Sequence, residues 1–380
     1  MKINKSTVGI ISYIAIALSA ILLLYVGNKV AVGGLPGADA DDSRTVEAEI
    51  TRIIADGGET VSFEAAIKNG AGREYVIGTQ DVSEYYLSGA KSAETGDRVI
   101  LSGNPGGEWR FVDYVRIRGI LLLGGVFILL LVLFGRIKGV NAILSLCLTC
   151  VSVFAVFLPA FLSGKNIYVF SVLVCVFSII TTLFVVNGVS MKSMAAVAGC
   201  LGGVAAICVL TLAMNKALNL TGALREDTMY LLNLPTGDPV NMRAVIFAGI
   251  VIGAVGAVMD VAMTISSSLW ELKSQAPELE FSSIFKSGVN IGQDVMGTMT
   301  NTLILAYIGS SLSLLLLLVV YVNSLTELLN SDSVVIEMLQ AVIGSFGILL
   351  TMPLTAFVCA MLYSRAPGGR KVGVNEQESL

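Results

Sequence analysis

The sequence predicts a membrane-embedded bundle of about eight helices, with one small β-rich domain inserted between the first and second helices. Three observations predict this fold class. The 380 residues are 55% hydrophobic and 14% charged, and their mean hydropathy is +0.81. Several apolar runs reach the roughly 20 residues that a helix needs to span a bilayer. The block 44–118 instead alternates short apolar segments with turn residues.

The N-terminal residues 1–27 are expected to form a membrane anchor. Lys2 and Lys5 precede an apolar run over 8–26, and this run is longer than the apolar region of an ordinary signal peptide. The following segments are a linker, a β-rich domain, a polytopic helical domain and a cytoplasmic tail, at residues 28–43, 44–118, 119–364 and 365–380.

The β-rich domain contains five predicted strands, at residues 45–54, 60–67, 73–77, 97–101 and 109–117. Turn sequences such as Asn69-Gly70 separate them. Five short strands predict a small barrel of the OB or SH3-like type. The block lacks a basic, aromatic-rich face, so nucleic acid is not an expected ligand. A protein partner outside the membrane is expected to bind residues 44–118 instead.

The seven further membrane spans are predicted at residues 119–135, 140–162, 167–187, 191–214, 244–264, 299–322 and 336–363. With a cytoplasmic N-terminus, the basic residues assigned to the cytoplasm are Lys2, Lys5, Arg136, Lys138, Lys192, Lys273, Lys286, Arg365, Arg370 and Lys371. Those assigned to the outside are Lys165, Lys216, Arg225 and Arg243. Because basic residues favour the cytoplasmic side, both termini are predicted to be cytoplasmic and the β-rich domain extracytoplasmic.

Two polar faces mark the region 245–310 as a candidate functional site. At about 100° per residue, the first helical face carries Gly249, Gly253, Gly256, Asp260, Ser267 and Glu271. A second face carries Asn290, Asp294, Gly297, Thr298 and Asn301. The segment 265–298 is too polar to span a membrane throughout, which favours a helix–break–helix or partly re-entrant segment. Together the two faces predict a buried polar site.

Two acids carry the expected chemistry. A buried Asp260 would be a proton carrier or cation ligand, although it could instead cap a helix end or pair with Lys273 or Lys286. Asp294 could bind a cation with oxygen ligands from its polar neighbours, or it could be a helix N-cap. Those neighbours are Asn290, Thr298 and Asn301.

The remaining residues have weaker assignments. Glu271 could guard the inner mouth of a path or be a solvated acid paired with Lys273, and Ser267 could line the path or bond back to its own helix. The four glycines Gly249, Gly253, Gly256 and Gly297 are expected to permit close helix packing. No metal is assigned, but Asp260, Asp294 and Asn301 are the candidate ligands if one binds. No cofactor is expected other than a bound cation.

These residues favour a transporter or permease for a small solute or ion, surrounded by membrane lipid and able to form a homo-oligomer. The sequence contains no histidine, which excludes the Ser-His-Asp chemistry, and no catalytic residue is assigned. One alternative is a membrane scaffold or assembly factor that acts through the external domain. A third interpretation is an intramembrane aspartyl hydrolase in which Asp260 and Asp294 share a proton.

The segments Gly249–Glu271 and Ser287–Leu303 resemble the YibE/F-like family of bacterial multi-pass membrane proteins, most closely over 245–310. The resemblance implies a bacterial plasma-membrane protein with one helix, an external β-rich domain and then a helical bundle. It also implies that the family signature includes Asp260, Glu271, Asn290, Asp294 and Asn301. It names no substrate.

Overall fold

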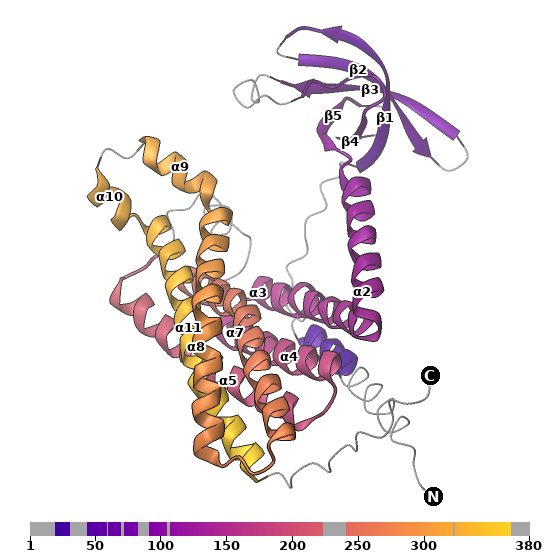
Figure 1. The fold of residues 1–380 in the computed structure, drawn as a ribbon. Helices are drawn as coiled ribbons and strands as arrows, with labels where there is room; N and C mark the ends of the chain where they lie inside the picture. The colour runs from indigo at the N-terminus through magenta and orange to yellow at the C-terminus, as the bar shows by residue number, and fades with distance from the viewer. Residues whose placement is uncertain are drawn as a thin grey trace, which may run out of the picture. The chain divides into compact units, whose positions relative to one another are not determined.

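The computed structural model describes residues 20–30, 44–58, 60–69, 72–82, 91–104, 107–222, 241–321 and 324–365. The chain forms two compact units, one of residues 37–134 and one of residues 1–36 together with 135–380 (Figure 1). Most of the expected linker 28–43, most of the tail 365–380 and the start of the expected anchor 1–27 lie outside the described residues.

The first unit contains a closed five-stranded barrel with the strand order β1-β2-β3-β5-β4. Its strands are β1 (Arg44–Asp56), β2 (Thr60–Asn69), β3 (Gly72–Asp81), β4 (Arg98–Gly103) and β5 (Trp109–Tyr114). Strand β1 pairs with both β2 and β4, which closes the barrel, and β3 pairs with β5 in parallel. The prediction of a small five-stranded barrel is confirmed. Strand β5 ends before the predicted Ile117, because that residue begins a helix.

Alternating side chains fill the interior of the barrel. Ile50, Phe63 and Leu101 are almost fully buried, as expected when successive strand residues point to opposite faces of a sheet. At Gly78, a Cβ atom would lie 2.7 Å from the Phe63 ring. A side chain at this position would therefore displace Phe63, so the close approach requires glycine.

The helices are α2 (Ile117–Ser152), the π-helix η2 (Val153–Phe157), α3 (Leu158–Leu162), α4 (Ile167–Asn187), α5 (Met191–Ala217), α7 (Met242–Gln275), α8 (Phe281–Ser310), α9 (Leu312–Tyr321), α10 (Leu325–Asn330) and α11 (Asp332–Ser364). Within the described residues, five helical stretches are long and apolar enough to cross a membrane, or six with one bent pair. The helix Ala20–Val30 is apolar but shorter. The predicted count of about eight spans is therefore not confirmed.

The predicted spans 119–135 and 140–162 fall in one continuous stretch, Ile117–Leu162. Its backbone departs from helical geometry at Arg136, which has φ 48° and ψ −129°. Non-glycine residues rarely adopt a positive φ, so this residue marks a local break in an otherwise helical run. The break coincides with the basic pair Arg136 and Lys138 that the sequence places between the two spans.

Helix α11 packs against α5, α7 and α8 in the second unit (Figure 1). Small residues permit this contact, because a Cβ atom on any of four glycines would collide with α11. The close pairs are Gly199 with Thr355, Gly203 with Thr351, Gly288 with Ala356 and Gly292 with Met352.

Helices α7 and α8 form an antiparallel hairpin, and the predicted segment 265–298 contains one break, the short turn 276–280. The predicted helix–break–helix is therefore confirmed. The partly re-entrant alternative stays a prediction. A further bend lies at Ser311, where the axis of α8 turns by 61° toward the helix that follows. The polar residues of α8 occupy an exposed stripe, whereas Ile284, Gly288 and Gly292 are buried.

Candidate functional site

Asp260 lies near the middle of α7, about 27 Å along the axis from Met242 and about 22 Å from Gln275. The interpretation that it caps a helix end is therefore wrong. Lys273 is about 20 Å further along the same helix, and its Nζ donates to the carbonyl oxygens of Pro277 and Leu279 at 2.6 and 2.9 Å. Lys273 thus stabilises the turn and does not pair with Asp260.

The predicted polar face of α7 points away from the buried core of the helical unit. Asp260 and Glu271 are exposed, as are the three glycines of this face, and Ser267 is half-buried. On the opposite side of the helix, Val258 and Val261 are fully buried. The helical periodicity therefore placed these residues on a common face, but that face is exposed rather than enclosed by the chain.

Asp294 also lies mid-helix, about 20 Å from Phe281 at the start of α8. Glu280 occupies the N-cap position, so the interpretation of Asp294 as an N-cap is wrong. The side chains that share its exposed face are Asn290, Thr298 and Asn301, together with Gly297. Thr298 Oγ1 donates to the Val295 carbonyl oxygen in its own helix at 2.9 Å.

Packing between the two helices fixes the relative depth of the acids. A Cβ atom at Gly288 would lie 2.8 Å from Leu269 Cδ1, and one at Gly253 would lie 2.6 Å from Tyr307 Oη. Because the helices are antiparallel, these contacts place Asp260 level with residues 297–300 of α8. Asp294 is therefore offset from Asp260 by only about 5–9 Å along the helix axes. Both carboxylates therefore lie at a similar level along the axes of the two helices.

Neither carboxylate makes a hydrogen bond or an ion pair with any residue that the structure describes. The described residues likewise contain no cluster of three or more acidic or cysteine side chains that could hold a metal ion. Two acids at mid-length on membrane-length helices cannot be left facing lipid without a large free-energy cost. Their exposed faces therefore require water or another protein surface beside them.

The glycines of α7 differ in what lies next to them. A Cβ atom at Gly249 would lie 3.3 Å from Gln340 Nε2 of α11, and Gly253 faces Tyr307 of α8. A Cβ atom at Gly256 or Gly297 would meet nothing within 4 Å among the described residues. The close packing predicted for these last two glycines has no partner there and stays a prediction.

Three polar side chains that the sequence interpretation missed lie at the part of this face that is nearer the start of α7. The Tyr307 hydroxyl is buried and has no hydrogen-bond partner in the described part of the chain. Glu337 of α11 lies close enough for its charge to act on this hydroxyl, and Gln340 lies one helical turn from Glu337. A signal was present, because Glu337 and Gln340 are polar residues in an otherwise apolar run, and intramembrane polar residues indicate function by default.

The part of the face that is nearer the end of α7 contains Glu271 and the serines. Glu271 Oε1 accepts a hydrogen bond from Gln275 Nε2 at 3.1 Å, so its partner is a neighbour on its own helix. Ser266, rather than Ser267, bonds across helices: its Oγ donates to the Lys192 carbonyl oxygen at 2.6 Å. Ser266 is thus part of the packing between α5 and α7.

The model of one protein family, described as YibE/F-like protein, matches residues 123–365. The chain belongs to the YibE/F-like family. The match covers more than half of the chain and includes the whole of α7, α8 and α11. The barrel precedes the matched residues, so the family relationship concerns the helical unit of this YibE/F-like protein. Neither the search of curated proteins nor that of solved structures found a match.

Proposed function

We propose that this YibE/F-like protein is a plasma-membrane transporter or permease for a small solute or ion, and that Asp260 and Asp294 handle a proton or cation. One observation carries the proposal. The two carboxylates lie at similar depths on neighbouring membrane-length helices, on faces that the chain itself leaves open.

The physical argument concerns the solvation of these acids. An aspartate at the centre of a membrane helix costs about 2.5–3.5 kcal/mol even on insertion scales. A water-lined path removes that cost and gives ions access to both acids. Asn290 and Asn301 would add neutral oxygen ligands of the kind that hard cations prefer. Glu271 would stand at the inner mouth, and Tyr307 at the outer part of the same face.

The proposed topology has eight spans, with both termini in the cytoplasm and the barrel outside a bacterial plasma membrane. The stretch Ile117–Leu162 would be about 69 Å long as a straight helix, more than twice the hydrocarbon core of about 30 Å. It would therefore cross twice, with its turn at Arg136. The bent pair α8–α9 and the N-terminal helix supply further crossings.

A second candidate is a membrane assembly factor that forms a homo-oligomer through α8. Its polar face lies opposite the face that packs on α11, and Gly297 is open. The barrel also exposes Tyr75, Ile77 and Val112, which would suit a protein partner outside the membrane. The hydrolase interpretation has less support, because the Asp260 and Asp294 carboxylates are not hydrogen-bonded to each other in the described residues.

Carbodiimide labelling in membranes tests the proposal. A water-soluble carbodiimide with an amine nucleophile should modify Asp260 and Asp294, and mass spectrometry of the peptides locates the adducts. Glu64 of the barrel, whose carboxylate is partly exposed, reports on reagent access to the extracytoplasmic side. Labelling of Glu64 without labelling of either aspartate would contradict a water-lined path and favour the assembly role.

A deletion of residues 44–117 separates the two candidates further. A transporter should keep some solute-dependent phenotype without its barrel, because the acids remain in the helical unit. An assembly factor that works through the barrel should lose its phenotype completely.

A further inference from the structure

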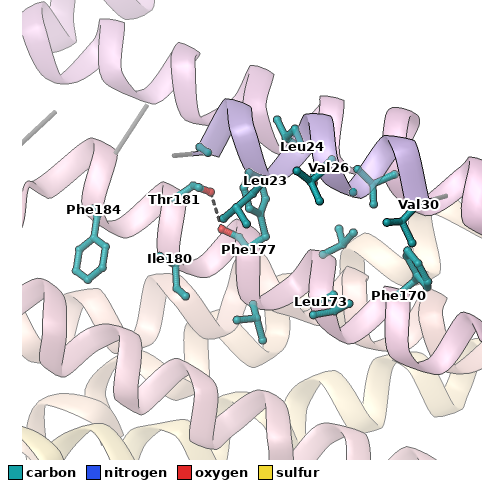
Figure 2. A pocket seen from close by; sticks show the side chains of 16 residues that line it. Leu23, Leu24, Val26, Val30, Phe170, Leu173, Phe177, Ile180, Thr181 and Phe184 are labelled. Atoms are coloured by element: carbon teal, nitrogen blue, oxygen red, sulfur yellow. Dashed lines mark hydrogen bonds between the residues drawn. The ribbon is translucent and has the colours of Figure 1, made fainter. Parts of the chain in front are cut away.

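A cavity of about 570 Å³ lies between the helix Ala20–Val30, the region of η2 and one face of α4. Figure 2 shows Leu23, Val26 and Val30 on the first of these helices, opposite α4. The α4 residues that line the cavity are Phe170, Leu173, Val174, Val176, Phe177, Ile180, Thr181 and Phe184. Its volume is within the range of about 300–1,000 Å³ that is usual for ligand sites.

The lining offers no polar group to a ligand. The two hydroxyl side chains in the wall are satisfied within their own helices: Ser152 Oγ donates to the Thr149 carbonyl oxygen and Thr181 Oγ1 to the Phe177 carbonyl oxygen, each at 2.7 Å. The remaining lining residues are apolar. An occupant must therefore be apolar, because a buried polar group without a hydrogen-bond partner is costly.

Specific contacts hold the walls of the cavity in place. The side-chain Nδ2 of Asn28 donates to the carbonyl oxygen of Ala155, and Ala155 belongs to the π-helical turn Val153–Phe157. A Cβ atom at Gly27 would lie 3.2 Å from the methyl groups of Val156, so glycine lets the two backbones approach closely. Single π-helical turns are rare and frequently occur at functional sites. These contacts hold the N-terminal helix against η2 at one wall of the cavity.

The shape of the cavity matches a lipid chain. From Phe170 to Phe184 its α4 wall extends about 21 Å, compared with roughly 15 Å for one leaflet of the hydrocarbon core. Val30 and Phe170 lie at the same end (Figure 2). At that end each helix carries an exposed lysine, Lys29 beside Val30 and Lys165 just before α4 begins. Two cations there complement the phosphate of a phospholipid.

We propose that this cavity binds one acyl chain of a membrane phospholipid, with the phosphate near Lys29 and Lys165. The site is separate from the acids of α7 and α8, and it does not depend on the transport role. The bound lipid would fill the space between the N-terminal helix and α4, which the side chains of these two helices do not fill themselves.

Native mass spectrometry of the full chain, purified in mild detergent and washed to remove loosely held lipid, tests the proposal. The wild-type protein should retain one phospholipid. Leu173→Trp, which fills the cavity from a side chain that is 55% exposed, should lower retention roughly tenfold, since excluding two methylene groups has about that effect. Leu23→Trp should do the same from the opposite wall. The control Val209→Trp lies on α5, outside the cavity, at a position that is 69% exposed, and should retain lipid.

Charge-reversal variants test the proposed position of the phosphate separately. Replacing both Lys29 and Lys165 by Glu should reduce retention of phospholipid but not of added diacylglycerol, whereas the exposed Lys216→Glu should change neither. Retention by Leu173→Trp and Leu23→Trp equal to that of the wild type would overturn the acyl-chain site. A wild-type protein that retains no phospholipid would overturn it as well, and would indicate that the chain's own residues fill the cavity.

Discussion

Ser266 Oγ of α7 lies 2.7 Å from Tyr363 Oη of α11, and both side chains are fully buried. Ser266 Oγ also donates to the Lys192 carbonyl oxygen of α5 at 2.6 Å, and Tyr363 Oη donates to the Ser266 carbonyl oxygen at 3.1 Å. The Trp270 ring packs edge-on against Tyr363, with ring centroids 5.2 Å apart. This network joins three helices at one end of the helical unit.

Removing the Tyr363 hydroxyl should destabilise this end of the helical unit. Tyr363→Phe removes a hydroxyl whose single hydrogen is shared between Ser266 Oγ and the Ser266 carbonyl oxygen, while Ser266 Oγ keeps its bond to Lys192. We expect a loss of about 1–2 kcal/mol in the free energy of unfolding. The control is Tyr168→Phe, whose ring packs edge-on against Phe247 at 5.0 Å and whose hydroxyl has no hydrogen-bond partner in the described residues. Thermal unfolding in detergent should show a lower Tm for Tyr363→Phe alone; equal Tm values would contradict the structural role of the network.

Substitution of two glycines by alanine should have different effects on stability. A Cβ atom at Gly199 would lie 2.9 Å from the Thr355 Cα of α11, and this backbone cannot move aside without shifting α11. Gly199→Ala should therefore destabilise the protein by about 1–3 kcal/mol.

Gly297→Ala is the matched change in open space, and it should be neutral or stabilising by up to about 1 kcal/mol because alanine favours a helix. Unfolding measurements on both variants check this pair. If Gly297→Ala were as destabilising as Gly199→Ala, the conclusion that a side chain at residue 297 meets no neighbour would be wrong. A change in its oligomeric state without a change in monomer stability would instead support the assembly role.

The barrel should lose stability in acid through Asp97. Burial acts to raise the pKa of Asp97, but hydrogen bonds from Lys91 Nζ at 2.9 Å and from the Glu94 backbone N–H at 3.0 Å outweigh it. The pKa of Asp97 is therefore held below its usual value. Since the folded pKa is below the unfolded value, the stabilisation is present above about pH 4. It is lost as the pH falls through the folded pKa.

Asp97→Asn removes this charge at every pH. We expect the barrel to lose about 1 kcal/mol at pH 7, because the Lys91 pair is partly exposed and therefore weak. The difference from the wild type should shrink toward pH 3. Hydrogen–deuterium exchange of peptides from 91–103, measured on the full chain, should reveal faster exchange in the variant at pH 7. If the variant and the wild type exchanged at the same rate at pH 7 as well as at pH 3, the proposed role of Asp97 would be wrong.

The barrel was predictable because its strands are short, alternate in hydrophobicity and end at glycine-containing turns. Val99 and Leu101, for example, are both fully buried on one face of β4. Which strands pair could not be predicted, since the parallel contact of β3 with β5 joins segments that are distant in sequence. The polar faces of α7 and α8 were also predictable from helical periodicity.

What the sequence could not supply was the environment of these faces. A polar face looks the same in sequence whether another helix, water or a second subunit covers it. Asp260 and Asp294 were expected in a buried site, yet the chain leaves both exposed. Tyr307 and Gln340 were missed because they approach α7 from two other helices, α8 and α11. Only the packing at Gly249 and Gly253 brings them to the same face.

Ligand-dependent thermal stabilisation of the purified protein tests the role of the two acids most directly. The melting temperature would be measured against a panel of monovalent and divalent cations from pH 5 to pH 8. A ligand that binds only the folded form must raise the melting temperature. We predict that at least one cation, or a change in pH, shifts the melting temperature of the wild type, and that Asp260→Asn and Asp294→Asn lose this shift while remaining folded. A flat response of the wild type, or a shift that both variants keep, would contradict the account.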